Sequence, residues 1–287
     1  MIKDRLYEPP DGELIYHYCR PEAFLEIVRH RVMWFSAYWV MNDVLEREWG
    51  YARFFGVLDN LRNELNDEFI EQVTTGIRFG TFANVAMVSC YSLDADVLSQ
   101  WRAYADDGRG FAIGLDPKRI KMPAKKLRVL YDESKQTSEL SGNIRHVFDY
   151  EKSIGFKFNV EFQKHWFNFG ADLVAYKHHG FREEKEIRLV HVSGLVRDND
   201  SFKIVALGAR DSDGNPIIGP QDVRFRVSNG MVIPYVALDY TNEGEEAPVR
   251  EVILGPKNES AETNIQIFLN TIGLKDVRVR RSTVPYR

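Results

Sequence analysis

The amino-acid sequence predicts an α+β protein, with a mixed, mostly antiparallel, split sheet and helices packed on it. Three observations lead to this class: short aromatic and β-branched runs near the start, a long helical segment in the middle, and short strands separated by Gly, Asp, Asn and Pro turns after residue 186. A chain of 287 residues with 44% hydrophobic residues can bury a sizeable core. It contains no internal repeat or convincing linker, so we expect one domain over residues 1–287.

The expected elements follow hydrophobic periodicity and local start and stop signals. Residues 14–19 form a short strand, and Pro21 suits the first turn of the helix that follows. Asn42 is expected to cap the first of two helices that make an insertion over about 42–75. A second helical insertion covers about 134–179, where aromatic residues recur at a spacing typical of core packing. Further strands are expected at 32–36, 85–91, 111–115, 186–192, 203–207, 223–227, 231–238, in the run 249–256 that stops at Pro256, and up to 281. Other helices are expected to end at residue 104 and to cover 260–272.

The charge balance argues against general nucleic-acid binding. The chain has 38 Lys and Arg against 42 Asp and Glu, a net charge of -4, and therefore lacks a field that attracts phosphate backbones. The basic run of Arg278, Arg280 and Arg281 alternates with apolar residues, which is typical of a solvated strand face; nucleic-acid processing stays as a weaker hypothesis. No segment approaches the roughly 18 apolar residues of a membrane span, so we expect no membrane partner and a cytoplasmic location.

Several motifs that could carry chemistry are rejected at this stage. No glycine-rich phosphate loop of the usual spacing is present. His178 and His179 are adjacent on an expected helix, where side chains point about 100° apart, so no metal is expected. Cys90 lies in an apolar run that suggests a buried, inert thiol. Glu184 and Glu186 alternate with basic residues and are interpreted first as part of an ion-paired strand.

Short motifs spread over nearly the whole chain resemble a large bacterial family, a domain of unknown function sometimes linked to abortive-infection and phage-defence loci. In chain order the motifs are Tyr16-His17-Tyr18, Asn42-Asp43 with Glu46, Ser89-Cys90-Tyr91-Ser92, Gln100-Trp101-Arg102-Ala103-Tyr104-Ala105, Gly110-Phe111-Ala112-Ile113-Gly114, Glu184-Lys185-Glu186-Ile187-Arg188 and Arg250-Glu251-Val252-Ile253-Leu254-Gly255-Pro256. This resemblance implies little about function by itself.

The order of these motifs is similar, more distantly, to the ADP-ribosyltransferase superfamily, in the branch that uses a His, Tyr, Glu triad. The resemblance implies an ADP-ribosyltransferase-like fold and NAD as the substrate, with one catalytic carboxylate. The implied site residues are His17 on a ribose, Trp101 or Tyr104 stacked on nicotinamide, Glu251 as the carboxylate, and Tyr18 and Ser92 as further NAD contacts. Glu184 and Glu186 have the carboxylate spacing of another branch and are the alternatives to Glu251. Tyr18-Cys19 departs from the small pair usual after the histidine and would narrow the NAD pocket.

The resemblance implies an NAD-dependent ADP-ribosyltransferase or NAD glycohydrolase-like protein that acts as a phage-defence or toxin effector on an acceptor that the sequence does not identify. Cleaving the nicotinamide–ribose bond develops a cation, which a nearby carboxylate stabilises. The alternative is a non-catalytic interaction or regulatory module of a defence system on the same scaffold. In that case His17 is a buried strand histidine, Trp101 a core residue and Glu251 an ion-paired carboxylate. The enzyme hypothesis requires His17 and Glu251 to converge on one hollow beside an aromatic ring.

Overall fold

The computed structural model describes residues 5–40, 44–206, 209–210, 216–218, 221–228, 230–241 and 246–286. Its strands are β1 (Ile15–Cys19), β2 (Val32–Ala37), β3 (Asn84–Ser92), β4 (Phe111–Leu115), β5 (Lys125–Arg128), β6 (Glu186–Asp198), β7 (Ser201–Ala206), β8 (Ala209–Arg210), β9 (Pro216–Ile218), β10 (Gln221–Asp222), β11 (Arg224–Ser228), β12 (Met231–Asp239), β13 (Val249–Leu254) and β14 (Arg278–Arg281). The longest path of neighbouring strands runs β10-β7-β6-β3-β1-β4-β13-β14. Every pair in this path is antiparallel except β13 with β14, which confirms the mixed, mostly antiparallel sheet of an α+β protein.

The sheet splits along one edge of β3. The other edge of β3 pairs with β6 over its whole length, from Asn84 to Ser92. On the split edge, β2 pairs with Met87 and Val88, whereas β1 meets β3 only at Ser92. Residues 89–91 of β3 therefore lie between the two partner strands. A strand edge without a ladder partner leaves backbone groups available to side chains, and this is the place where the candidate site forms.

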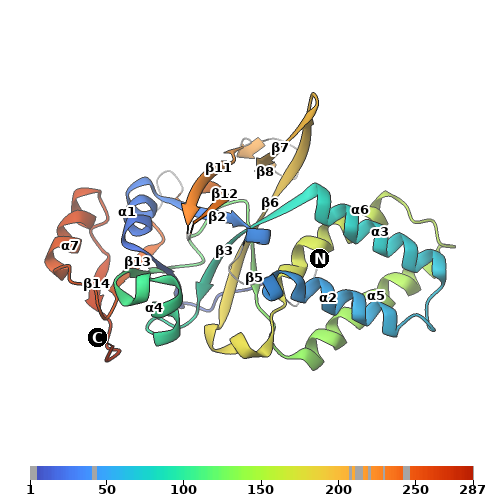
Figure 1. The fold of residues 1–287 in the computed structure, drawn as a ribbon, viewed down its shortest axis with the longest axis horizontal. Coiled ribbons are helices and arrows are strands. Elements are labelled where there is room, and N and C mark those ends of the chain that lie inside the picture. The colour runs from blue at the N-terminus through green and yellow to red at the C-terminus, as the bar shows by residue number, and fades with distance from the viewer. Residues whose placement is uncertain are drawn as a thin grey trace.

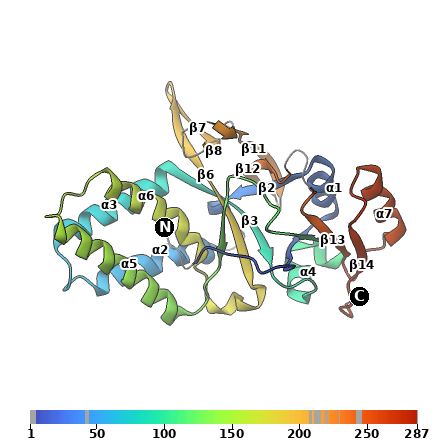
Figure 2. The same cartoon turned by 180° about the vertical axis from the view of Figure 1, so that it is seen from behind.

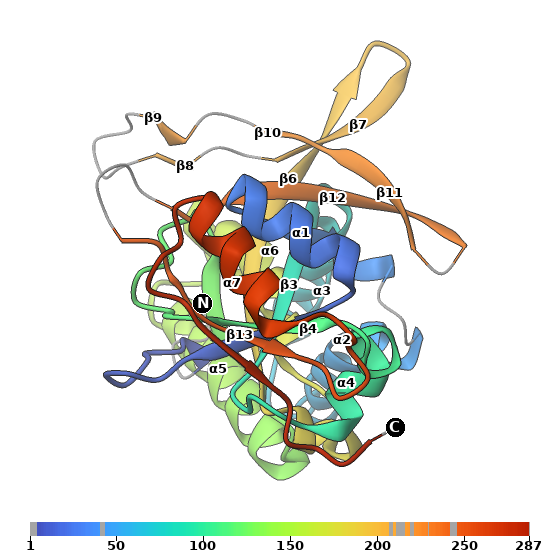
Figure 3. The same ribbon diagram turned by 90° about the vertical axis from the view of Figure 1, so that its left-hand side faces the viewer.

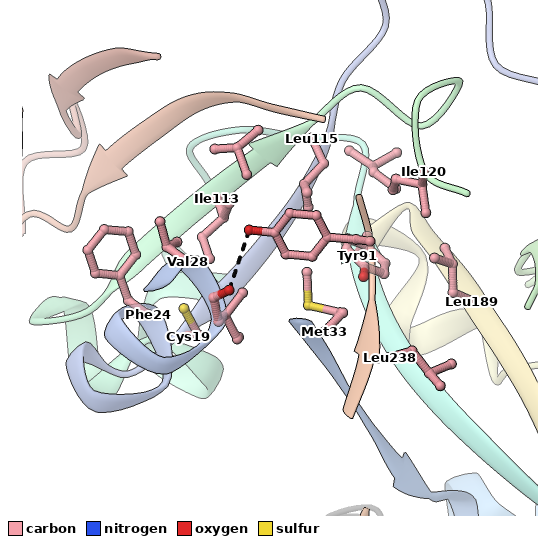
Figure 4. Packing of buried hydrophobic residues seen from close by; sticks show 14 of the residues in the cluster. Cys19, Phe24, Val28, Met33, Tyr91, Ile113, Leu115, Ile120, Leu189 and Leu238 are labelled. Carbon is pink, nitrogen blue, oxygen red and sulfur yellow. Dashed lines mark hydrogen bonds between the residues drawn. The ribbon is translucent and has the colours of Figure 1, made fainter. Parts of the chain in front are cut away.

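Three helices pack on the sheet: α1 (Pro21–His30), α4 (Leu98–Tyr104) and α7 (Glu262–Thr271). Figure 3 shows α1 and α7 side by side in front of β13 and β4. Pro21 occupies the first turn of α1 as expected, and the helix buries Phe24, Ile27 and Val28. Phe24 stacks on Phe111 of β4 with ring centroids 4.1 Å apart, so apolar burial holds α1 against the strands (Figure 4).

The remaining long helices form a separate body beside the sheet, seen from two sides in Figures 1 and 2. They are α2 (Val44–Asn60), α3 (Asp67–Ala83), α5 (Glu133–Ser153) and α6 (Val160–Asp172). Their shared core contains Phe54, Phe69 and Trp166, all fully buried. The aromatic residues at helical spacing are therefore core residues, as expected. No helix in the described ranges is long and apolar enough to cross a bilayer.

The two expected insertions are helical, but their bounds differ from the prediction. The first runs on to Ala83 and breaks at 61–66, where the Asn66 side chain caps α3 through Phe69 N–H at 2.7 Å. The second breaks before Asn159, whose side chain caps α6, and α6 ends at Asp172 instead of near 179. Asn42, the expected cap of the first helix, lies outside the described residues.

The sequence pattern did not predict β5, and it predicted a β6 that ends too early. β5 buries only one residue, Leu127, in a Lys-rich segment that carries no alternating signal. It forms because β6 offers an edge to it at residues 187–190. β6 itself continues beyond the expected 192, because β7 folds back on it as a hairpin. Both features depend on long-range or hairpin pairing and not on local propensity.

Candidate functional site

A cavity of about 260 Å³ opens where the sheet splits. Residues of β1, β2, β3, α1, α4, β11 and β12 line it, together with the start of β6. It contains six of the side chains that the sequence nominated: His17, Tyr18, Ser92, Tyr104, Glu184 and Glu186. Trp101 and Glu251 are not among its lining residues. The cavity therefore brings six of the eight predicted site residues together, and Trp101 and Glu251 lie outside it.

His17 bridges the split from β1 to β3. Its Nδ1 lies 2.9 Å from the backbone oxygen of Cys90, in the part of β3 between the two partner strands. A carbonyl oxygen only accepts, so Nδ1 carries the proton and Nε2 is left as an acceptor. Burial lowers the pKa of His17, and nearby Arg226 lowers it further, against the effect of the Cys90 hydrogen bond. The wall of the cavity therefore includes the neutral imidazole of His17, whose Nε2 is a hydrogen-bond acceptor.

A cluster of opposite charges lies at the start of β6. Lys177 Nζ lies 2.5 Å from Glu184 Oε2 and 3.3 Å from Glu186 Oε2. Arg188, which is fully buried, donates to both oxygens of Glu186 at 2.9 Å. A two-pronged guanidinium–carboxylate pair of this kind fixes geometry as well as charge. The sequence-based interpretation of this strand as ion-paired is confirmed.

The two carboxylates differ in the strength of their pairing. Burial alone raises the pKa of Glu186, but Arg188 and Lys177 outweigh it and hold the pKa at about 2. Burial also raises the pKa of Glu184, and in this case the opposing effect of Lys177 does not overcome it. Glu186 is thus ionised at neutral pH and serves as the structural partner of Arg188. The charge of Glu184 is less fully compensated, because within the described part of the chain only Lys177 pairs with it.

This difference makes a prediction about stability and pH. The folded-state pKa of Glu186 lies below the ordinary 4.5, so its stabilisation is present above 4.5 and is lost as the pH falls towards 2. The loss is on the order of 3 kcal/mol. Glu184 has the opposite sign: its raised pKa means that protonation favours the folded state as the pH falls through that pKa.

Urea unfolding of the natural chain and of Glu186→Gln over this pH range measures the Glu186 contribution. The difference in unfolding free energy between the two should shrink below about pH 4.5 and approach its minimum near pH 2. A difference that stays constant over that range would contradict the assignment. Taking the difference cancels the contributions of carboxylates that the two proteins share.

Tyr104 and Ser92 hold Glu184 in place. The Tyr104 hydroxyl donates to Glu184 Oε1 at 3.0 Å, and the Ser92 hydroxyl donates to the Glu184 backbone oxygen at 2.8 Å. Tyr104 is 38% exposed and lines the cavity, so part of its side chain is accessible to a ligand. Tyr18 also borders the cavity, but its hydroxyl is used by the backbone of Asp94 and Val97. Tyr18 therefore serves mainly to position the segment before α4.

Trp101 does not line the cavity and has no accessible surface. It is fully buried, donates from Nε1 to Asp96 at 2.7 Å, and packs edge-on against Tyr18 with centroids 4.8 Å apart. The hypothesis that Trp101 stacks on a ligand is wrong, because its ring faces are covered by the protein. Of the two nominated aromatic residues, Tyr104 is the one placed to contact a ligand.

Glu251 lies on the other face of the sheet from His17. In the register of β1, β4 and β13, Glu251 is level with Gly114 and Tyr16, whereas His17 is level with Ile113. Residues opposite one another share a face, and successive residues alternate between faces. Gly114 lets Tyr16 and Glu251 meet above it, since a Cβ there would lie 2.9 Å from the Tyr16 ring and 3.1 Å from Glu251 Cβ.

The partners of Glu251 agree with this placement. Tyr16 donates to Glu251 from its hydroxyl at 3.2 Å, and Arg280 of the neighbouring β14 donates from Nε at 2.9 Å. Arg278 adds a looser contact at 3.7 Å. The structure does not bring His17 and Glu251 together, because the strand register sends them to opposite faces. The run of arginines near the end is partly neutralised by the same carboxylate.

Cys90 corrects a second expectation. The thiol was expected to be buried and inert, but the residue is half-buried, lines the cavity and hydrogen-bonds to Glu186. The apolar run around it suggested burial on both faces of a central strand. The split leaves this part of β3 without a strand neighbour on one edge, so the cavity reaches it.

Glu133, His178 and His179 could offer metal ligands, with one ligand atom each within 4.8 Å of one another. The expectation that the two histidines point apart is wrong: their ring centroids are 4.1 Å apart, because His178 is extended and only caps the short helix that begins at His179. His178 Nδ1 accepts a backbone N–H, and Glu133 pairs with His179 and Arg53. These groups have protein partners, and we assign no metal to them.

Three cavity cations were missed by the sequence analysis: Arg20, Lys177 and Arg226. Lys177 lies after the helical segment, and Arg226 lies on the β11–β12 hairpin. Both belong to segments that are rich in charged residues, so nothing local distinguishes them from surface cations. Their role comes only from the folding of distant segments around the split.

Comparison with known families adds one finding. Residues 100–189 match the model of a family described as "Protein of unknown function (DUF2971)". The match supports the expected resemblance to a domain of unknown function. The matched segment contains the cavity residues Tyr104, Lys177, Glu184 and Glu186, and also Arg188, which pairs with Glu186. Neither the curated proteins nor the solved structures gave a match to the chain.

Proposed function

We propose that the cavity binds NAD and that the protein cleaves the nicotinamide–ribose bond, as an NAD-dependent ADP-ribosyltransferase or NAD glycohydrolase. One observation carries the proposal: an acceptor nitrogen of His17, the Glu184 carboxylate and the partly exposed Tyr104 ring border a single cavity. This is the set that the superfamily resemblance implies, with Glu184 in the place first given to Glu251. Glu186 shares the ion-pair partner Lys177 with Glu184 and so helps to hold that lysine in place.

The chemistry assigns a role to each group. The bond from ribose C1′ to the nicotinamide nitrogen breaks, and its electron pair leaves with the nicotinamide. Glu184 stabilises the cation that develops on the ribose, in a partly buried place where a charge acts more strongly than in water. Water or an acceptor hydroxyl then bonds to C1′ and gives up its proton, which Glu184 or solvent can take. His17 Nε2 would accept a hydrogen bond from a ribose hydroxyl, and Tyr104 would lie against the leaving ring.

The size of the cavity suits part of the ligand. Its volume of about 260 Å³ lies just below the roughly 300–1,000 Å³ of small-molecule sites. The cavity would take the nicotinamide side of the dinucleotide, with the adenosine side along the rim. NAD consumption would suit the phage-defence or toxin role that the resemblance implies.

Incubation of the full chain with NAD, with free nicotinamide measured over time, tests the proposal. We expect release above the rate of NAD alone. The proposal would be overturned if the protein neither released nicotinamide nor bound NAD in a calorimetric titration. Binding without release would favour the non-catalytic alternative.

The non-catalytic alternative also has support: Trp101 is a buried core residue and Glu251 is ion-paired, as that alternative expects. An exposed face is a further observation in its favour. The hairpin of β11 and β12 exposes Phe225, Val227 and Val232 on one face, each at least 65% exposed. Exposed apolar patches of this kind mark interaction surfaces more often than chance. A regulatory module would use this face for a partner protein and would release no nicotinamide.

His17 provides a matched pair of variants. His17→Asn keeps an N–H near the position of Nδ1 for the Cys90 oxygen but removes the acceptor at Nε2. We expect NAD affinity to fall about tenfold, the worth of one hydrogen bond, with little loss of stability. His17→Gln, whose longer side chain reaches the Nε2 position, should retain more affinity. Equal affinity in His17→Asn and the natural chain would remove His17 from the site.

A further inference from the structure

Arg226 stands at the cavity wall with an incomplete set of partners. Its Nη2 donates to Ser36 Oγ at 3.1 Å, and its guanidinium lies over the Trp34 ring at 5.5 Å. Its Nε is buried and has no hydrogen-bond partner among the residues that the structure describes. Buried N–H groups are nearly always paired, so an orphan beside a cavity points to a missing acceptor. The Ser36 and Trp34 contacts hold the guanidinium in place while that acceptor is absent.

Arg226 is partly buried, which lowers its pKa, and lies near Tyr235, which raises it, and near Arg20, which lowers it. Within the described ranges, no carboxylate lies at ion-pair distance from it. Arg20, which also lines the cavity, is close enough to add to the effect of burial in lowering the pKa of Arg226. An arginine stays protonated even so. An arginine that has no carboxylate partner among the described residues, beside a hollow that Arg20 also lines, attracts an anion.

The carboxylates of the cavity, Glu184 and Glu186, lie further along β3 than Arg226 does. Along β3, Ser36 and therefore Arg226 are level with Val88, whereas Glu186 is level with Ser92. Four residues of strand span about 13 Å. A ligand that fills this space meets arginine at one level and glutamate at the other. NAD has a matching charge pattern, since its pyrophosphate is anionic and its nicotinamide ring is cationic.

We propose that Arg226, together with Arg20, forms the subsite for the pyrophosphate of a dinucleotide, and that this sets the ligand's direction with nicotinamide towards Glu184. The inference rests on the proposed function for the identity of the dinucleotide. The anion subsite itself rests on the orphan Nε, the Ser36 and Trp34 contacts, and the absence of an acidic partner among the described residues. The hydroxyl of Ser228, on the same strand, is a further donor at this level.

Binding of inorganic pyrophosphate and of ADP to the full chain tests the subsite separately from catalysis. Calorimetric titrations compare the natural protein, Arg226→Gln and Arg224→Gln. Arg224 is the matched control because it lies on the same strand, is exposed and borders a different hollow. We expect Arg226→Gln to weaken both ligands by about tenfold or more, as charge-assisted hydrogen bonds imply. Arg224→Gln should bind as the natural protein does.

A second variant, Arg226→Lys, and a spectroscopic measurement on His17 cover the case in which Arg226→Gln does not fold. If Arg226→Gln unfolds, Arg226→Lys serves in its place, because it keeps the charge but loses the fork that can pair with two phosphate oxygens. The His17 imidazole resonance should shift when pyrophosphate binds the natural protein, since Arg226 acts on that ring. Equal weakening in the Arg226 and Arg224 variants, or no binding of either ligand, would overturn the subsite.

The outcomes also separate this inference from the proposed function. Pyrophosphate binding that depends on Arg226, without any nicotinamide release, would support the subsite and remove the enzyme activity. Nicotinamide release with the same KM for NAD in the natural protein and in Arg226→Gln would keep the activity and overturn the subsite.

Discussion

Replacing Glu184 by glutamine should lower the rate of nicotinamide release by about 10²–10³-fold, the effect of removing one well-placed group that stabilises transition-state charge. Glutamine has nearly the same shape and can still accept the Tyr104 hydroxyl, so the cavity should keep its form. What it lacks is the negative charge beside the developing ribose cation. The loss should therefore fall on kcat more than on the KM for NAD.

Two controls locate this effect. Glu183→Gln changes an exposed neighbour outside the cavity and should leave the rate unchanged. Glu251→Gln removes a carboxylate that does not line the cavity and should alter stability through Arg280 but not the chemistry. If Glu251→Gln loses release while Glu184→Gln keeps it, the cavity is not the catalytic site. Thermal unfolding of each variant separates loss of fold from loss of activity.

Replacing Arg188 by methionine should lower the free energy of unfolding by about 3–5 kcal/mol, because Glu186 would be left with half of its charge compensation in a buried place. The guanidinium also donates to the Val174 backbone oxygen at 2.6 Å and lies over the Tyr38 ring. Methionine fills similar volume without these donors. Urea unfolding measures the change.

The paired variant distinguishes charge from packing. Arg188→Met combined with Glu186→Gln removes both charges of the pair, so it should recover part of the stability lost in Arg188→Met alone. The same double variant leaves Lys177 paired with Glu184. Strictly additive losses would show that the two side chains contribute independently, and the ion-pair account of Glu186 would then be wrong.

Local signals predicted much of the secondary structure because they depend on neighbours in sequence. Pro21 starts α1, and the alternating and apolar runs around Ile15, Val88 and Val252 form β1, β3 and β13 as expected. The aromatic residues of the middle segment pack in a helical core. The ends of helices were less well predicted, since the caps at Asn66 and Asn159 divide segments whose periodicity continues across the break.

The site was predicted in part. His17, Tyr18, Ser92, Tyr104, Glu184 and Glu186 line one cavity, although Glu184 and Glu186 were the second choice. Glu251 was preferred because it opens a late strand, but whether it shares a face with His17 depends on a three-strand register that one sequence does not encode in any local pattern. Trp101 and Tyr104 are both on α4, and only packing decides which of them is covered.

The sequence by itself determined the α+β class, the order of most helices and strands, and the residues able to carry charge or hydrogen-bonding chemistry. These follow from periodicity, turn residues and side-chain type, which are properties of short segments. Only the tertiary structure decided that β1 and β2 share one edge of β3, which opens the cavity. It also decided that Lys177 and Arg226 reach that cavity and that Glu251 pairs with Arg280 outside it. Pairing between distant strands selects these neighbours, and a one-residue change of register would send each side chain to the opposite face.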